Sequence, residues 1–290
     1  MFKGIVFSIL VYLLYSRLEK LDWSERQFDD FQLIPFIVCF LFVPLNWYFE
    51  WLKWELLLQS INEEKNPNRF TAFVSGIVSS FLTPAFSGNF LGRIIYFEAN
   101  KRWKLTVYSM VSNFSQFTVS MFFGAIAGII LLYEKESYFS ELSIGLFIGA
   151  TITSLLIYFF GETLASPIKI QRVQSMVLLV KKGPSRLKII AFSLLRYLVF
   201  LLQFSLALSS FGIAFEYLNL LWIALVYMAV TLTPSLFFGK IVMRESIAVS
   251  ILTLAGIATF PILLASLTTW FFNLLIPTFV SVFFIKFKRS

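Results

Sequence analysis

Residues 82–93 read LTPAFSGNFLGR and residues 232–244 read LTPSLFFGKIVMR, so one pattern occurs twice in strongly apolar surroundings. Each copy places a proline, a glycine and an arginine in the same order. A proline removes one backbone hydrogen bond and clashes with the preceding turn, so each copy predicts a break in a helix. Broken helices at corresponding places in two halves of a membrane protein expose backbone dipoles, and they are typical of transporter binding sites.

The composition indicates an integral membrane protein. The chain is 58% hydrophobic, 19% aromatic and 14% charged, and its mean hydropathy is +0.81. Apolar runs recur without a long charged or Gly/Ser-rich tract, so we expect a single integral membrane domain over residues 1–290.

The chain has no histidine and one cysteine, Cys39. These counts exclude His-based triads, His/Cys metal sites and internal disulfides. Carboxylate-based chemistry stays open, although the only acids beside the two copies, Glu98 and Glu245, stand in separate halves. We therefore expect no catalytic residue, no metal and no cofactor.

The apolar runs predict an all-α polytopic membrane protein with about eight transmembrane helices of roughly 20 residues each, plus a re-entrant hairpin. A further apolar stretch, 70–97, contains the first copy of the pattern. If it crossed the membrane, Arg69 and the basic cluster 101–104 would lie on opposite faces, against the positive-inside rule. We therefore predict that 70–97 is the re-entrant hairpin. The predicted spans are 3–17, 34–52, 105–132, 142–160, 189–211, 218–233, 246–264 and 267–285.

This topology places both termini and most basic residues on the inner face. That face collects Lys3, Lys53, Lys65, Arg69 and the basic clusters 101–104, 169–188 and 286–289. The net charge of +8 is then mainly a topology signal, with attraction to anionic lipid as a second consequence, and nucleic acid is not implied.

The inner loop 161–188 alternates apolar and basic residues from Ile168 to Lys182, before Gly183-Pro184. The alternation fits an amphipathic helix on the inner leaflet or, equally, a basic loop that only fixes the orientation.

The two copies also predict an anion-binding site. Gly88 and Gly239 permit a turn, and a helix that restarts there presents free N–H groups that favour a phosphate or carboxylate. Arg93 and Arg244 would add full charges, and Glu98 or Glu245 could neutralise them in an empty site. The candidate substrate-binding residues are Thr83, Pro84, Gly88, Asn89, Arg93, Asn113, Gln116, Arg196, Gln203, Thr233, Pro234, Gly239, Arg244 and Glu245.

A purely structural interpretation explains the same residues. Proline and glycine are common in membrane helices, and arginines near the inner interface anchor a span. Asn113, Gln116 and Gln203 could serve only as hydrogen-bonding contacts between helices.

The order of motifs resembles a known family. A Trp-rich stretch, NWYFEWLKW at 46–54, precedes the first copy, and Leu195-Arg196-Tyr197 and Gln203-Phe204 precede the second copy with its Arg244-Glu245. This order resembles the lysylphosphatidylglycerol synthase transmembrane family, also described as flippase-like, over nearly the whole chain.

The resemblance implies an eight-span domain that, in two-domain aminoacyl-lipid synthases, is associated with moving the modified phospholipid between leaflets. Because the chain stops at Ser290, directly after the last predicted span, it implies a stand-alone member without the synthase domain, and we expect no enzymatic activity. Family members often carry Gly-Glu where this chain has Gly88-Asn89, and a Glu-Arg pair where it has residues 112–116, SNFSQ. These departures leave the identity of the headgroup open.

The leading functional hypothesis is lipid translocation or lipid handling in the bacterial inner membrane, with an anionic headgroup held between two broken helices. An alternative is a membrane partner of a cytosolic transferase in envelope lipid or glycan modification, bound through loop 161–188. A third is an ion-coupled carrier of a small anionic solute, which the scarcity of buried acids disfavours. The expected partners are therefore a membrane lipid and, in the second case, a cytosolic transferase.

Overall fold

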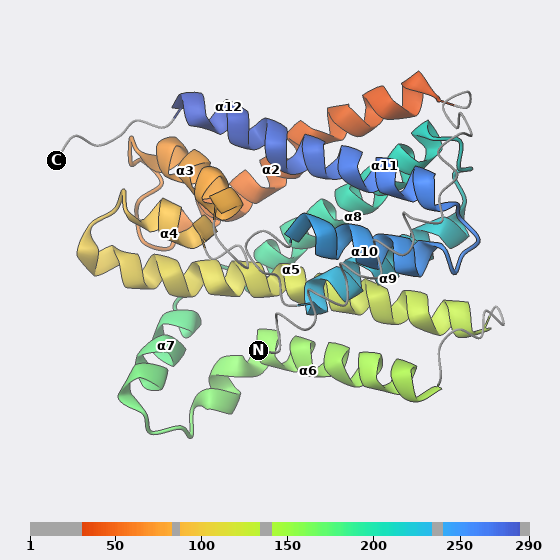
Figure 1. The fold of residues 1–290 in the computed structure, drawn as a ribbon. Coiled ribbons are helices and arrows are strands. Elements are labelled where there is room, and N and C mark those ends of the chain that lie inside the picture. Colours follow the sequence, from red (N-terminus) through yellow and green to blue (C-terminus); the bar gives the residue numbers. More distant parts are fainter. Residues whose placement is uncertain (1–30, 83–87, 134–140, 234–239, 285–290) are drawn as a thin grey trace. The chain divides into compact units, whose positions relative to one another are not determined.

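The computed structural model describes residues 31–82, 88–133, 141–233 and 240–284 (Figure 1). Every element in these ranges is helical apart from an isolated bridge between Phe31 and Phe211, which confirms the all-α prediction. The elements are α2 (Leu33–Gln59), α3 (Arg69–Leu82), α4 (Gly88–Ile94), α5 (Ala99–Tyr133), α6 (Glu141–Ala165), α7 (Gln171–Lys181), α8 (Arg186–Ser210), α9 (Tyr217–Leu232), α10 (Lys240–Leu252), α11 (Thr259–Trp270), the π-helical turn η2 (Phe271–Leu275) and α12 (Ile276–Phe284).

Five helical stretches of the described chain are long and apolar enough to cross a membrane, so the protein is a multi-pass membrane protein. Four of them contain most of the predicted spans 34–52, 105–132, 142–160 and 189–211. The predicted span 218–233 corresponds to α9, a shorter apolar helix, and 3–17 lies outside the described residues. The five stretches are Leu33–Gln59, Ala99–Tyr133, Gly145–Ala165, Arg186–Ser210 and Thr259–Phe284.

The prediction of one span over 246–264 is wrong, because α10 ends at Leu252 and α11 begins at Thr259. Gly256 has a φ of 75°, its N–H donates to the Thr253 carbonyl, and the Ile257 N–H donates to the Leu252 carbonyl. This is a Schellman motif, which ends a helix at a glycine. The last of the five stretches, which we call the last span, is therefore Thr259–Phe284, whereas the sequence predicts a start at 267.

The last span contains the π-helical turn η2, directly before Pro277 in α12. Proline lacks an N–H and clashes with the carbonyl four residues earlier, here that of Asn273. A widened turn at this point accommodates the clash, since local changes of helix type commonly accompany proline.

Each copy of the repeated pattern begins at the last residue of one helix and extends into a second helix that packs against the first. The first joins α3 to α4 and the second joins α9 to α10, while residues 83–87 and 234–239 lie outside the described ranges. The break predicted within 70–97 is thus present, and insertion of the α3–α4 pair into the membrane stays a prediction.

Two glycines allow α3 and α4 to approach closely. A Cβ on Gly76 would lie 2.6 Å from Arg93 Cγ, and a Cβ on Gly92 would lie 1.9 Å from Ser79 Oγ. A side chain at either position would require a neighbouring atom to move, so these glycines set how closely α3 and α4, which lie side by side in Figure 1, approach each other.

Contacts between residues divide the chain into two compact units. Unit 1 contains Arg244 of the second copy, and unit 2 contains Arg93 of the first copy. Unit 1 comprises Met1–Asn46, Ser120–Ile148 and Leu198–Leu275, and unit 2 comprises Trp47–Val119, Gly149–Tyr197 and Ile276–Ser290.

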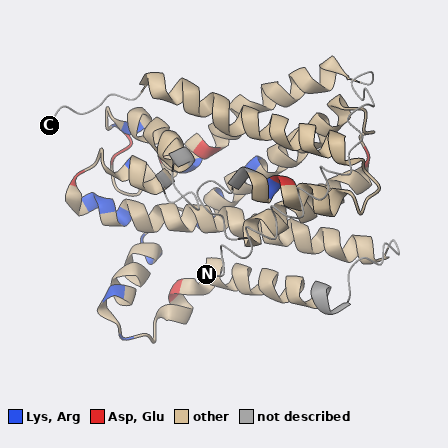
Figure 2. Cartoon of the chain, viewed as in Figure 1, with Lys and Arg blue, Asp and Glu red and all other residues tan. Residues whose placement is uncertain are grey.

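Basic residues of unit 2 occur on α7 and at the start of α5 (Figure 2). The helix α7 forms within the predicted amphipathic segment, with Ile170 before it and Leu178 within it both more than half exposed. A helix in this segment is therefore confirmed, whereas its position on the inner leaflet stays a prediction.

Candidate functional site

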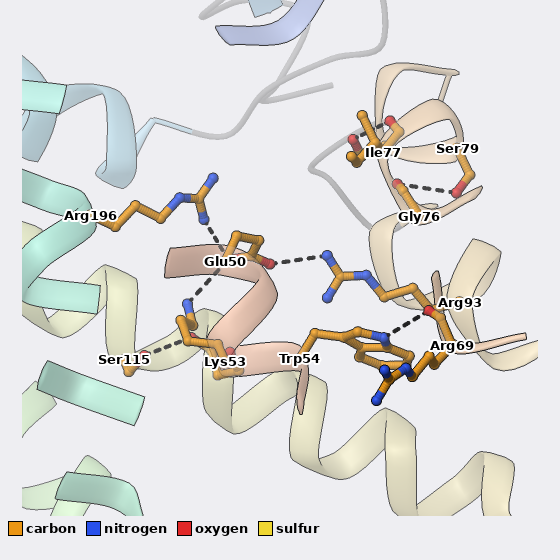
Figure 3. A network of polar contacts seen from close by, with 12 residues as sticks. Glu50, Lys53, Trp54, Arg69, Gly76, Ile77, Ser79, Arg93, Ser115 and Arg196 are labelled. Atoms are coloured by element: carbon orange, nitrogen blue, oxygen red, sulfur yellow. Dashed lines mark hydrogen bonds and ion pairs between the residues drawn. The ribbon is translucent and has the colours of Figure 1, made fainter. Parts of the chain in front are cut away.

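A buried carboxylate, Glu50 of α2, meets three cations in unit 2. Its Oε1 accepts a hydrogen bond from Arg93 Nη2 at 3.1 Å, and its Oε2 accepts one from Arg196 Nη1 at 2.7 Å (Figure 3). Lys53 Nζ lies 3.5 Å from the same Oε2. The four side chains are between 2% and 17% exposed. We call Glu50, Lys53, Arg93 and Arg196 the charge cluster; it carries two more positive than negative charges.

Aromatic rings of α2 and α3 hold the guanidinium groups. Arg93 Cζ lies 5.1 Å from the Trp54 ring centroid and 4.9 Å from that of Phe73, and Arg196 Cζ lies 5.7 Å from that of Trp47. Trp47, Glu50 and Trp54 follow a helical spacing of three and four residues, so they share one face of α2. Cation–π contacts are strongest where the cation is desolvated, as these are.

A narrow crevice adjoins the charge cluster. The gaps between its lining atoms amount to about 190 Å³, open solvent included, and they are too narrow for a water molecule. Three buried polar atoms of its lining have no hydrogen-bond partner among the described residues: Arg93 Nε, Asn89 Oδ1 and Ser109 Oγ. The full lining is Leu57, Asn89, Phe90, Arg93, Ser109, Ser112 and Asn113.

The charge surplus and the two unpartnered groups that can donate, Arg93 Nε–H and Ser109 Oγ–H, favour a polar anion, whereas Asn89 Oδ1 is an acceptor and requires a donor instead. A buried charge without a counter-ion costs several kcal/mol, and an unsatisfied buried polar group costs about 1–3 kcal/mol. An anion beside Arg93 would offset both costs, because its oxygens accept from Nε and balance part of the surplus charge.

Unit 1 contains a second polar group around the second copy of the pattern. Arg244 Nη2 donates to Thr269 Oγ1, and Ser266 Oγ donates to Glu245 Oε1 at 2.9 Å. Asn273, in the π-helical turn, bonds the Thr269 carbonyl and the Gln203 side chain, each at 3.0 Å.

This group extends along a chain of buried amides. Asn46 Nδ2 donates to Asn273 Oδ1 at 2.7 Å, and Gln203 Nε2 donates to the Cys39 carbonyl at 3.1 Å. These bonds join α2, α8 and the last span within unit 1. Gln203 thus has the hydrogen-bonding role between helices that the structural interpretation assigns to it.

The predicted residues fall into three groups. In unit 2, Asn89, Arg93 and Asn113 line the crevice, whereas Gln116 is not part of its lining. Arg196 is linked to Arg93 through the carboxylate of Glu50, which accepts a hydrogen bond from each arginine. Gly88 is the first residue of α4. In unit 1 lie Gln203, Arg244, Glu245 and Thr233, whose hydroxyl donates back to the Ala229 carbonyl at the end of α9. Outside the described ranges lie Thr83, Pro84, Pro234 and Gly239.

The structure corrects one expectation about charged residues and adds to another. The carboxylate that meets Arg93 is Glu50 and not Glu98, whose side chain is 70% exposed and lies 3.8 Å from Lys101. Lys53, which the sequence places on the inner face, is buried beside Glu50 because α2 continues to Gln59, and its side of the membrane stays a prediction. The sequence signal that points to a buried Glu50–Lys53 pair is an acid and a base three residues apart within an apolar run.

The comparisons with known proteins agree with the motif order. A family model for the lysylphosphatidylglycerol synthase TM region matches residues 1–281. Comparison with curated proteins found no match, and neither did comparison with solved structures. The match covers nearly the whole chain, so the protein belongs to the lysylphosphatidylglycerol synthase TM region family.

Proposed function

We propose that the protein moves a membrane lipid between leaflets and binds its anionic headgroup at the charge cluster of unit 2. The observation that carries the proposal is the buried surplus of two positive charges beside the unpartnered Arg93 Nε. Membership of the lysylphosphatidylglycerol synthase TM region family supports a lipid-related function.

The chemistry of the charge cluster suits a phosphodiester. Guanidinium groups present several N–H donors in a plane and bind phosphate oxygens in pairs. Glu50 engages one nitrogen of each arginine, which leaves Arg93 Nε for a ligand in the crevice. Glu50 thus holds the two arginines in position and, as an anion itself, competes with the headgroup, which permits release.

The narrow crevice requires a second state. Because it is too narrow for a water molecule, a headgroup can enter only when the crevice widens. Moving a polar headgroup through an apolar membrane requires a binding site that alternates between closed and open states. The acyl chains stay in the bilayer.

A lipid-scrambling assay tests the proposal. The full chain is reconstituted in vesicles with headgroup-labelled phosphatidylglycerol, and the rate of lipid movement is measured for Arg93→Gln and Arg196→Gln. Each variant loses a charge-assisted hydrogen bond worth about 1.5–3 kcal/mol, so we expect the rate to fall at least about tenfold.

Arg69→Gln is the matched control. Arg69 also stacks on a tryptophan of α2, but its side chain is 44% exposed and it bonds the Glu64 carbonyl outside the charge cluster. Its variant is expected to retain the wild-type rate. Equal rates in all three variants would refute the assigned site. Arg244→Gln, in the same assay, tests the prediction that the second copy of the pattern also takes part in headgroup binding.

A further inference from the structure

Glu245 is a buried carboxyl group in unit 1 that has no counter-ion among the described side chains. It is 3% exposed, and its Oε1 accepts a hydrogen bond from Ser266 Oγ. Its Oε2 is buried and has no hydrogen-bond partner among the described residues. No ion pair within those residues includes Glu245.

The neighbouring cation is engaged elsewhere. Arg244 is adjacent in sequence, so its side chain leaves α10 about 100° away from that of Glu245. Its Nη2 donates to Thr269 Oγ1. Arg244 therefore provides only a longer-range attraction to Glu245, without the hydrogen bond that Glu50 receives from each of two arginines.

The side chains of the two helices that pack against α10 are neutral. The helix α10 packs against α9 and α11. The titratable residues of α9 are Tyr217, whose side chain is exposed, and Tyr227, whose hydroxyl donates to the Phe200 carbonyl. The sequence of α11 contains no titratable residue and offers Ser266 and Thr269. An ionised Glu245 would therefore keep one oxygen without a donor in an apolar setting, which is costly, and protonation removes that cost.

We propose that the Glu245 carboxyl group is a binding site for an exchangeable proton. A proton from water binds Oε2 and converts the carboxylate to a neutral acid, and its return to water restores the charge. If lipid moves as proposed above, this site couples the movement to a proton gradient, because the neutral and charged forms favour different states of unit 1. This second step rests on the proposed function, whereas proton binding itself does not.

Infrared difference spectroscopy on the full chain in lipid nanodiscs tests the proton directly. Exposed glutamates ionise near pH ~4.3, so a protonated carboxyl band that persists more than about one pH unit above this value belongs to a buried acid. We expect this band in the wild type, its loss as the pH rises further, and its absence in Glu245→Gln. The matched control, Glu216→Gln, removes an exposed glutamate of the same unit and keeps the band.

Two spectroscopic outcomes would overturn the proposal. A missing band in the wild type means that Glu245 is a permanent carboxylate, and a band that never titrates means that its proton does not exchange. Glutamine keeps the acceptor for Ser266 Oγ and resembles the neutral acid, so Glu245→Gln is expected to retain the wild-type Tm. A large fall in Tm would likewise contradict a protonated Glu245.

Vesicles with an imposed pH gradient test the coupling. With one proton per lipid, each pH unit shifts the distribution of labelled lipid between leaflets by up to about tenfold in the wild type and in Glu216→Gln. Glu245→Gln should show no shift. An equal distribution in the wild type with and without the gradient, or a response to sodium alone, would overturn the coupling. Absence of any lipid movement would instead refute the proposed function, and the infrared band would still decide the proton site.

Discussion

Replacing Glu50 by glutamine removes the carboxylate that the three cations of the charge cluster share. The side chains of Glu50, Lys53 and Arg93 are at most 5% exposed, so water cannot replace the lost charge. Two charge-assisted hydrogen bonds, each worth about 1.5–3 kcal/mol, are weakened, and glutamine retains one oxygen acceptor. We therefore expect the free energy of unfolding to fall by about 3–5 kcal/mol, the usual cost of leaving a buried charge unpaired.

The assay is unfolding of the purified protein in mixed micelles, followed by tryptophan fluorescence. This signal reports on the charge cluster because three tryptophans of α2 lie within about one helical turn of Glu50. Glu55→Gln is the control in the same helix, because Glu55 pairs with the exposed Arg69 at 3.4 Å. Such a pair contributes at most about 1 kcal/mol. Equal losses in the two variants would refute a buried, shared carboxylate. Phosphatidylglycerol should restore part of the loss in Glu50→Gln, because a bound anion stabilises the folded state.

Three further predictions concern the helix pairs and the loop after α2. Gly76→Ala should lower the free energy of unfolding by about 1–3 kcal/mol, because its Cβ would lie 2.6 Å from Arg93 Cγ; Gly149→Ala, with no atom within 4 Å, should not. Gly256→Ala should cost about 1–2 kcal/mol, since alanine is strained at a φ of 75°, and an unchanged melting curve would contradict the Schellman motif. The hydrogen bond from Lys101 holds the pKa of Glu63 below its usual value, so the stability from this pair is complete above pH ~4.3 and is lost as the pH falls through the lower folded-state pKa. Lys101→Ala should therefore weaken the fall of Tm in acid, and an identical pH profile would count against the pair.

The helix breaks were predictable because proline and glycine act locally. Pro84 and Pro234 mark the connections between α3 and α4 and between α9 and α10 from sequence alone. Gly256 is not evident from sequence, because a single glycine in a continuous apolar run is a weak signal until its φ is known. The sequence therefore predicts one span over 246–264, which continues past the end of α10.

The arginines of the site were predictable, whereas their carboxylate was not. Arg93 and Arg196 stand out because charges inside apolar segments are costly and usually face a protein interior. Glu50 and Lys53 stand at the end of the predicted span 34–52, and the sequence places Lys53 on the inner face and does not single out Glu50. The extension of α2 to Gln59, and the contacts from α4 and α8, come from tertiary structure, which local patterns do not specify.

The affinity of the purified protein for phosphatidylglycerol, compared with phosphatidylcholine, tests the anion-binding charge cluster most directly. We predict tighter binding of phosphatidylglycerol, at least about tenfold weaker binding in Arg93→Gln, and tighter binding in Glu50→Gln, where the competing carboxylate is gone. Arg69→Gln should bind like the wild type. Equal affinity for the two lipids, or an affinity for phosphatidylglycerol that Arg93→Gln leaves unchanged, would contradict an anion site at the charge cluster.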